Sequence, residues 1–459
     1  MRPERGPVKT SRSFLTWALA YGLGRSVIKG AARRGDLVGR LELDPALRED
    51  PFPAYEQLRT VGPVSRHRIV LASVDHAACT EILRGDDFGV AGGHGELPRP
   101  LRRLLAKVYD DGARGPVDPP SMLAVDPPSH TRYRKLVSRA FTARAVRALE
   151  DRTRETAEEL LDQISASGRD RVDIVEAYAA ELPVVVVAEI LGVPREMHPQ
   201  LLEWGNGAAV TLDPALTWRQ YRAAERNVQA LHSWFADHVA ELRRAPTDDL
   251  FSKLVHLDGD DRLTDVELHA TGLLVLAAGF ETTVNLIGNA VHHLGRHPDQ
   301  LALLQADPSL WPNAVEEVLR YDSPVQLTLR IANRDTEVAE VPIKRDEAVL
   351  TLLGGANRDP AVFSDPDVFD VRRENAGAHL AFSSGIHFCL GAGLARMEAT
   401  VALRALYDRF PDLTPAGLPT RRGTRVLRGY EHLPCATRRP RGTSGLRPVA
   451  QVERAPRPS

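Results

Sequence analysis

One cysteine lies in a glycine-containing segment that suits a metal-bound thiolate. Cys389 follows Gly385 by four residues and precedes Gly391 by two, and a helical pattern over residues 392–407 begins directly afterwards. The amides and dipole of a helix N-terminus favour a thiolate over a thiol. Glycine also lets backbone approach a bulky group closely. The segment therefore predicts an axial thiolate ligand for a haem iron, and the alternative is a buried structural cysteine at a helix start.

The residues around this thiol do not complete a zinc site. His387 and Cys389 supply only two plausible ligands, and Cys79 and Cys435 lie far away without paired spacing. A structural zinc ion is held by four ligands. An odd number of widely separated cysteines also argues against a disulfide framework and favours a reducing compartment.

An acid and two threonines interrupt the longest apolar helix that the sequence predicts, over residues 265–296. Glu281 is costly to bury without a partner, whereas Thr282 and Thr283 can bond back to the carbonyl four residues earlier and bend the helix. Gly279 lowers the local helix propensity. Together these residues predict a polar notch in an apolar wall, which suits dioxygen and water above an iron. The alternative is a core helix whose threonines are satisfied locally.

Two further pairs combine charge with helical spacing. Glu317 and Arg320 are three residues apart among apolar neighbours, so they share a helix face and partial burial is plausible. His130 and Arg134 are four apart, and such groups suit the two propionates of a haem. The alternatives are a surface ion pair of little energetic value and a basic helix start on the surface.

The order of these motifs resembles that of the cytochrome P450 family. A propionate helix, an acid–alcohol helix, a Glu-x-x-Arg helix and a cysteine loop follow one another as in that family, over about residues 42–436. The chain is similar to the soluble actinobacterial branch of these haem-thiolate monooxygenases. It departs from the family pattern at Ser383, where Gly is usual. The backbone conformation of the turn is therefore not predicted from the family pattern, whereas the cysteine ligand is unaffected.

The resemblance assigns roles to residues of this chain. It implies Cys389 as the ligand of the haem iron and Glu281 and Thr282 as catalytic groups that control proton delivery. The haem-binding residues that it implies are His130, Arg134, Arg330, His387, Phe382, Gly385, Gly391 and Ala278. The structural residues that it implies are Glu317, Arg320 and a later arginine, Arg373, with Arg372 as the alternative in register.

The resemblance also implies a reaction and its partners. A haem b would carry monooxygenation with O2, and electrons would come from NAD(P)H through a ferredoxin reductase and a ferredoxin. The substrate would be a hydrophobic small molecule such as a lipid, a terpenoid or a polyketide (macrolide). Arg132, Arg139 and Arg396 are candidates for docking an acidic ferredoxin. The alternatives are a non-catalytic haem-thiolate sensor and a peroxide-driven peroxygenase.

Composition limits the fold and the partners. The chain has 459 residues, 43% of them hydrophobic, and a net charge of −2 gives no bulk attraction to nucleic acid. Helical periodicity dominates, with strand-like segments at 336–343 and 348–353 and a hairpin within 62–75. Predicted strands and helices do not alternate as in βαβ units, which argues against a doubly wound parallel sheet. We expect a mainly α fold with small β-sheets in a single large domain over residues 42–436.

Basic segments flank this domain at both ends. Residues 1–12 and the Arg- and Pro-rich segment 437–459 are expected to be disordered. Residues 13–41 are expected to form an N-terminal amphipathic helix, which Arg25 and Lys29 make too polar for a transmembrane segment. A peripheral contact of this helix with a membrane surface stays open, and we expect a cytoplasmic protein.

Overall fold

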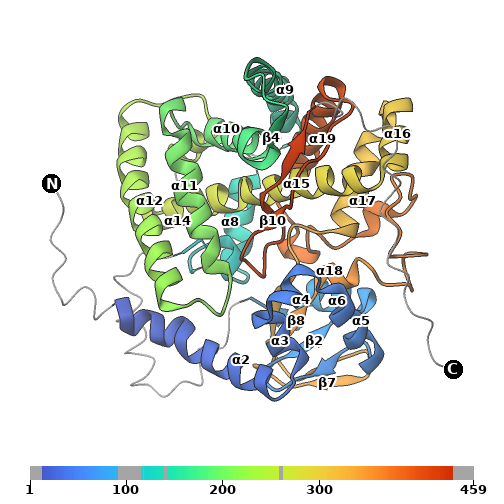
Figure 1. Cartoon of the computed structure of the whole chain (residues 1–459). Helices are drawn as coiled ribbons and strands as arrows, with labels where there is room; N and C mark the ends of the chain where they lie inside the picture. The colour runs from blue at the N-terminus through green and yellow to red at the C-terminus, as the bar shows by residue number, and fades with distance from the viewer. Residues whose placement is uncertain (1–12, 91–114, 117, 139–141, 258–261, 438–459) are drawn as a thin grey trace.

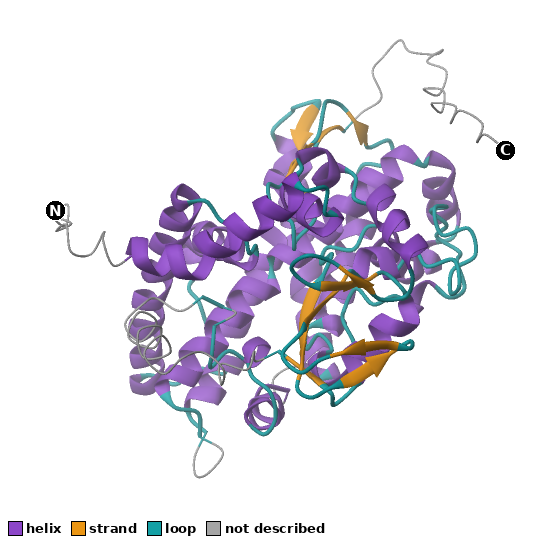
Figure 2. Ribbon diagram, turned by 90° about the horizontal axis from the view of Figure 1, so that it is seen from below, coloured by secondary structure: helices purple, strands orange, loops and turns teal. Residues whose placement is uncertain are grey.

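An apolar helix pair crosses the centre of the molecule, and the other elements surround it (Figure 1). The pair consists of α14 (Asp265–Gly279) and α15 (Glu281–Arg296), which are separated only by Phe280. Most strands lie together in one part of the molecule with helices beside them, and a smaller group lies at another edge, near the C-terminus (Figure 2). The computed structural model describes residues 13–90, 115–116, 118–138, 142–257 and 262–437.

The other helices precede or follow this pair. Those before it are η1 (Ala18–Gly22), α2 (Leu23–Arg33), α3 (Leu37–Leu43), α4 (Pro45–Glu49), α5 (Phe52–Val61), α6 (His76–Arg84), η2 (Met122–Ala124), α8 (Ser129–Ser138), α9 (Ala143–Ala166), η3 (Val175–Ala179), α10 (Glu181–Leu191), η4 (Arg195–Met197), α11 (His198–Ala209), η5 (Val210–Leu212), α12 (Trp218–Arg244) and α13 (Leu250–Val255). Those after it are α16 (Pro298–Ala306), η7 (Pro308–Leu310), α17 (Trp311–Tyr321), α18 (Leu353–Ala356), η8 (Ala376–Ala378), η9 (Gly385–His387) and α19 (Ala392–Arg409).

The largest sheet has five strands in the order β1-β2-β8-β5-β3. Its strands are β1 (Ser65–Arg66), β2 (Leu71–Ser73), β8 (Ala348–Thr351), β5 (Thr328–Ala332) and β3 (Phe88–Gly89). β2 and β8 run parallel, and the other neighbours are antiparallel. The smaller sheets comprise β4 (Arg171–Asp173), β12 (Pro434–Ala436) and β9 (Thr414–Pro415), then β10 (Thr420–Arg421) with β11 (Tyr430–His432), and β6 (Thr336–Val338) with β7 (Val341–Ile343). The predicted mainly α fold class with small sheets is confirmed.

Two of the β segments predicted from the sequence agree with the structure to different degrees. The hairpin within 62–75 is confirmed by the antiparallel pairing of β1 with β2. The segment 336–343 is a hairpin of two short strands rather than one strand-like piece. Its turn residues Ala339 and Glu340 have positive φ angles of 48° and 64°. Such turns usually contain Gly, Asn or Asp, so the residue types at this place do not indicate a turn.

The N-terminal helix packs along the segment that joins α11 to α12. The indole Nε1 of Trp17 donates to the carbonyl of Leu216 at 3.0 Å, and the hydroxyl of Tyr21 donates to that of Thr211 at 3.3 Å. This helix ends at Arg33, before Gly35 with φ of 81°, and α3 is a separate helix. The range 13–41 is therefore divided between two helices. The prediction for residues 1–12 lies outside the described residues, as does that for 437–459 apart from Thr437, whose backbone N–H donates to the carbonyl of Asp170.

The α14–α15 segment is the one described stretch with the length and composition of a membrane span. It covers 32 residues, from Asp265 to Arg296, and 67% of its most apolar window is buried inside the protein. Leu273, Leu276 and Ile287 are each at most 1% exposed. This burial is that of a core helix, whose apolar surface is covered by neighbouring helices.

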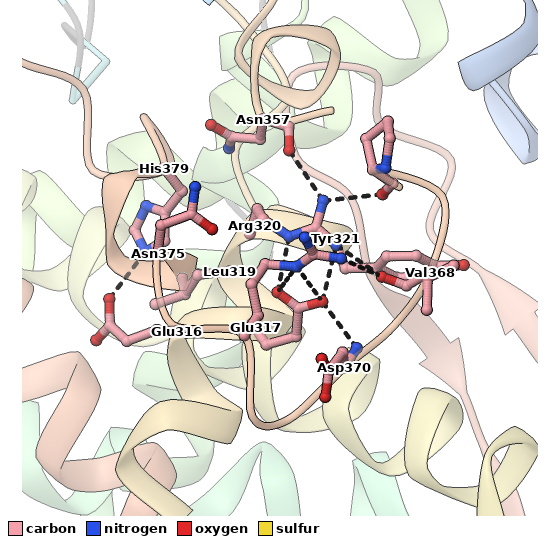
Figure 3. Close-up of polar contacts among 12 residues, drawn as sticks. Glu316, Glu317, Leu319, Arg320, Tyr321, Asn357, Val368, Asp370, Asn375 and His379 are labelled. Atoms are coloured by element: carbon pink, nitrogen blue, oxygen red, sulfur yellow. Dashed lines mark hydrogen bonds and ion pairs between the residues drawn. The ribbon is translucent and has the colours of Figure 1, made fainter. Parts of the chain in front are cut away.

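A buried ion-pair cluster joins α17 to the chain that leads to Cys389 (Figure 3). Arg320 donates from Nε and Nη2 to the two carboxylate oxygens of Glu317, at 2.7 and 2.8 Å, and both residues are fully buried. Arg320 also donates to the carbonyls of Asn357 and Val368. Arg373 reaches the same carboxylate at 3.3 Å, so the later arginine at this cluster is Arg373 and not Arg372.

We expect Arg320→Met to destabilise the fold by about 3–5 kcal/mol, because it leaves the Glu317 carboxylate buried with only part of its compensation. The matched control is Arg404→Met, since Arg404 forms an exposed pair with Asp408 at 3.7 Å. Exposed pairs contribute less than about 1 kcal/mol. Urea unfolding of the two variants measures the difference. Equal losses for both would contradict a stabilising role of the cluster.

Candidate functional site

Cys389 lies between η9 and the start of α19. Its backbone N–H donates to the carbonyl of Phe382 at 2.9 Å and closes the loop. All three cysteines of the sequence are described, and Cys389 is exposed whereas Cys79 and Cys435 are buried. Burial raises the pKa of each of the two buried thiols to about 12, so neither provides a thiolate near neutral pH. Cys389 is the thiol that remains accessible to a ligand.

The surroundings of the Cys389 sulfur act on its pKa in opposite directions. Desolvation by the neighbouring protein raises the pKa of this thiol. The backbone N–H of Gly391 and the guanidinium groups of Arg134 and Arg396 act to lower it. The predicted stabilisation of the thiolate by amides and cations is therefore present, but the loss of hydration caused by the surrounding protein outweighs it, even though the residue keeps one side accessible. Bonding to a metal is the interaction that holds such a sulfur in its deprotonated form.

The loop before Cys389 depends on two left-handed backbone positions. Gly385 has φ of 69°, and a Cβ there would collide with the carbonyl oxygen of Leu83 in α6. Ser383 has φ of 61°, a region that costs a non-glycine residue free energy. Its hydroxyl has no hydrogen-bond partner among the described residues. The structure thus explains why a glycine is the usual residue at the position of Ser383.

Buried donors from three elements form a set that fits the two carboxylates of a haem. The rings of His130 in α8 and His387 in η9 lie 4.3 Å apart. Arg330 in β5 is 4% exposed and has no ion pair in the described part of the chain, its donors reaching only a hydroxyl and a carbonyl of its own strand. Burial lowers the pKa of Arg330 to about 10 and that of His387 to about 4. Arg330 is thus a buried cation without an ion pair among the described residues, and it fits an anionic propionate, to which the two imidazoles can add hydrogen bonds.

The central helix pair is interrupted at the predicted place. The hydroxyl of Thr282 donates to the carbonyl of Ala278 at 2.9 Å, and that of Thr283 donates to the carbonyl of Gly279 at 3.4 Å. Ala278 is exposed although most of the helix around it is buried. α15 packs against α19, which begins just after Cys389. The break and the thiol therefore belong to neighbouring helices.

Glu281 is the buried acid at this break. It is 2% exposed, its Oε1 lies 3.7 Å from Nη1 of Arg422, and its Oε2 has no hydrogen-bond partner in the described structure. Burial raises the pKa of Glu281 to about 7, and Arg422 opposes the rise. A carboxyl with this pKa gains and loses a proton near neutral pH, which suits proton transfer.

The partner of Glu281 was not predicted from the sequence. Arg422 lies in an arginine-rich stretch, 421–428, far along the chain from Glu281. That richness is a signal for a charge cluster, but it does not indicate which acid the stretch meets.

The arginines predicted to dock a ferredoxin have partners within the chain. Arg132 donates to Glu267 at 2.9 Å, and Arg396 pairs with Glu316. Arg139 lies outside the described residues, as does most of the segment 88–108, which the family resemblance implies as part of the substrate pocket. The described structure therefore offers no free guanidinium among the candidates for docking.

Comparisons with known proteins agree with this geometry. The family model of cytochrome P450 matches residues 111–308 and 309–417. This chain belongs to the cytochrome P450 family. It is 50% identical over 424 residues to a protein of Mycobacterium tuberculosis named as cytochrome P450 140, covering 92% of this chain and 96% of that one. It is 45% identical over 314 residues to 6-deoxyerythronolide B hydroxylase of Saccharopolyspora erythraea, covering 67% of this chain and 76% of that enzyme.

A solved structure shows the same fold. The cytochrome P450BioI, determined in complex with an acyl carrier protein ligated to hexadec-9Z-enoic acid, has a TM-score of 0.76 and 34% identity. The match covers 85% of this chain and 99% of that one. The chain is therefore a monooxygenase of the cytochrome P450 family, whose members use a haem with a thiolate ligand. The exposed thiol and the uncompensated donors around it fit that cofactor.

We expect Ser383→Gly to stabilise the protein by about 0.5–1 kcal/mol, because glycine tolerates the left-handed backbone without the steric cost. The matched control is Ser384→Gly. Ser384 has φ of −152° and its hydroxyl accepts from Nε of Arg84 at 2.7 Å, so that change should destabilise. Thermal unfolding measures both. Destabilisation by Ser383→Gly would show that the Ser383 backbone is not strained.

Proposed function

We propose that this P450 inserts one oxygen atom from O2 into a C–H bond of an apolar small molecule, with Glu281 and Thr282 handling protons beside the Cys389 thiolate. The observation that carries this proposal is the break between α14 and α15, which places an acid and a hydroxyl together on the helix that packs against α19. A sensor that only binds ligands has no need for a buried titratable acid there. The arrangement therefore favours turnover over the non-catalytic alternative.

The residues around Cys389 would hold a haem b. When bound, this group supplies the redox and dioxygen chemistry of the reaction. Cys389 would ligate the iron. The propionates would be bound by Arg330, Arg134, His130 and His387. Phe382, Gly385, Gly391 and Ala278 would leave room for the ring, since none of them carries a polar side chain or, apart from Phe382, a bulky one.

Proton handling would rest on Glu281 and Thr282. Glu281 has a pKa of about 7, so near neutral pH it exists in both protonation states. Thr282 donates its own proton to the Ala278 carbonyl, which leaves its oxygen lone pairs free to accept a hydrogen bond. A movement of the Glu281 side chain between Arg422 and the break would carry a proton from the outer to the inner side of the helix.

The substrate would be apolar and related to polyketides or lipids. The family resemblance implies Leu274 and residues 327–329 as part of the pocket; Leu274 and Leu327 are each 7% exposed, and Leu329 is 44% exposed. Their apolar side chains favour a hydrophobic guest. The names of two relatives point in the same direction, since one is a hydroxylase of 6-deoxyerythronolide B and another was determined with a hexadecenoyl carrier protein.

Electrons would come from NAD(P)H through a ferredoxin reductase and a ferredoxin. The described residues show no glycine-rich nucleotide fingerprint after a strand, so a separate protein would have to supply them. A dependence of product on both NAD(P)H and a ferredoxin separates this route from a peroxide-driven reaction. Product formed with peroxide alone, at the same rate, would favour the peroxygenase.

We expect Thr282→Ala to keep its haem but to lower the product formed per O2 consumed by roughly tenfold or more, because a positioned proton carrier is lost. Thr282→Ser, which retains the hydroxyl, should restore most of the yield. The measurement pairs product analysis with oxygen uptake in a system reconstituted with NAD(P)H, ferredoxin reductase and ferredoxin. An unchanged yield in the alanine variant would remove Thr282 from proton handling.

Glu281→Gln should flatten the pH dependence of stability. The pKa of Glu281 is raised in the folded protein to about 7, so the folded state binds this proton more tightly than the unfolded chain. Its contribution is fully present below the unfolded pKa and is lost as pH rises to about 7, by on the order of 3 kcal/mol. Urea unfolding between about pH 5 and pH 8 measures the slope, with the exposed Glu374→Gln as control. Identical slopes in wild type and Glu281→Gln would contradict the raised pKa.

A further inference from the structure

Five arginines converge on a small cavity beside the segment 421–429. They are Arg48 in α4 and Arg421, Arg422, Arg425 and Arg428. The volume of this arginine cavity is about 10 Å³, which is the space of a single water-sized atom.

Arg425 is the most informative of these residues because its charge is buried without an ion pair. It is 4% exposed. Its Nη2 donates to the hydroxyl of Tyr55 at 2.9 Å, and its Nε has no hydrogen-bond partner. No carboxylate in the described residues forms an ion pair with it. Burial acts to lower the pKa of Arg425, but the Tyr55 hydroxyl and the Glu42 carboxyl raise it above the ordinary value, so Arg425 is a cation whose Nε still lacks an acceptor. An anionic acceptor makes the strongest hydrogen bond to such a donor.

Three other donors at the cavity are also unsatisfied. Nε of Arg48, Nη1 of Arg421 and Nε of Arg422 are buried and have no hydrogen-bond partner within the described structure. Buried polar groups are bonded in the great majority of cases. Four such N–H groups on arginines around one cavity therefore form a built site for an acceptor, and their charge favours an anionic one.

The acids near the cavity do not cancel this charge. Asp322 is shared by Arg421 and Arg428, and Glu49 pairs with Arg421 at the surface. Both oxygens of Asp213 accept backbone N–H groups of the segment, and this carboxyl also offsets part of the charge of Arg425 and Arg48. Burial raises the pKa of Glu42 and of Glu281 to about 7, so neither carries a full negative charge at neutral pH.

We propose that the arginine cavity binds one anionic atom, either an oxygen of a carboxylate or a halide ion. The cavity volume is too small for a whole phosphate, whereas one carboxylate oxygen or one small ion fits. The carboxylate has two sources. It is the acidic end of an apolar substrate, which rests on the function proposed above, or it is a small free anion such as formate.

The first test measures thermal unfolding of the haem-loaded protein in Hepes buffer. Sodium formate or sodium chloride is titrated at constant ionic strength against sodium gluconate, whose anion is too large for the cavity. The wild type should gain Tm in a saturable way. Arg425→Met should give no such gain, because it removes one of the donors and part of the charge that bind the anion. Arg345→Met, at an exposed arginine, is the control and should respond like the wild type.

The second test distinguishes the two sources of the anion. Long-chain carboxylic acids and their methyl esters are titrated into the protein, and the shift of the Soret band is recorded. If the acid end of the substrate occupies the cavity, acids should bind about tenfold or more tightly than esters, the loss expected for a hydrogen bond to a charged group. Arg425→Met should remove this preference and leave ester binding unchanged. Arg425→Lys, which keeps the charge, should retain part of it.

The outcomes separate the site from the function. A gain in Tm with formate or chloride and no preference for acids assigns the cavity to a free anion. A preference for acids that Arg425→Met abolishes assigns it to the substrate. Equal responses of wild type and Arg425→Met in both tests would overturn the proposal. Turnover of a neutral substrate would continue in that case, so the proposed monooxygenase function would stand.

Discussion

The bidentate ion pair between Glu317 and Arg320 ties the chain that leads to Cys389 to the helical core. Arg320 donates to carbonyls of that chain at Asn357, Pro366 and Val368, and Glu317 accepts the backbone N–H of Asp370. These bonds provide partners for backbone groups between residues 357 and 370, where the described chain has little regular secondary structure. Because the carbonyls of Asn357, Pro366 and Val368 accept from Arg320, the position of the chain before the cysteine loop depends on a charge pair that is fully buried.

Two other buried arginines form no ion pair with a carboxylate of the described chain, and their surroundings suit an anionic ligand. Arg330 beside the cysteine loop and Arg425 beside the arginine cavity are each 4% exposed, and neither has a carboxylate partner among the described residues. If only the stability of the fold mattered, a paired charge or an apolar residue would be more favourable than an unpaired arginine at each of these positions. Their persistence is understandable if anions from outside the chain complete them, a haem propionate at Arg330 and a small anionic group at Arg425.

Local patterns predicted much of the site, whereas long-range contacts were not predictable. The helix break followed from Gly279 and two threonines, because back-bonding to the preceding turn is a property of a few adjacent residues. The contact of Glu281 with Arg422 joins positions far apart in the sequence, and spacing carries no information about it. The turn at Ala339 and Glu340 was missed for a different reason, since neighbouring strands impose positive φ on residues that show no preference for it.

Arg422 connects the two unsatisfied regions of the molecule. Its Nη1 lies 3.7 Å from Glu281, and its Nε is one of the free donors at the arginine cavity. One guanidinium therefore lies between the carboxyl at the helix break and the cavity. Its positive charge opposes the rise of the Glu281 pKa, and an anion in the cavity would offset part of that charge. The charge state of Glu281 and the proposed occupancy of the cavity would thus be linked through a single side chain, because Coulomb interactions act strongly over short distances in a buried environment.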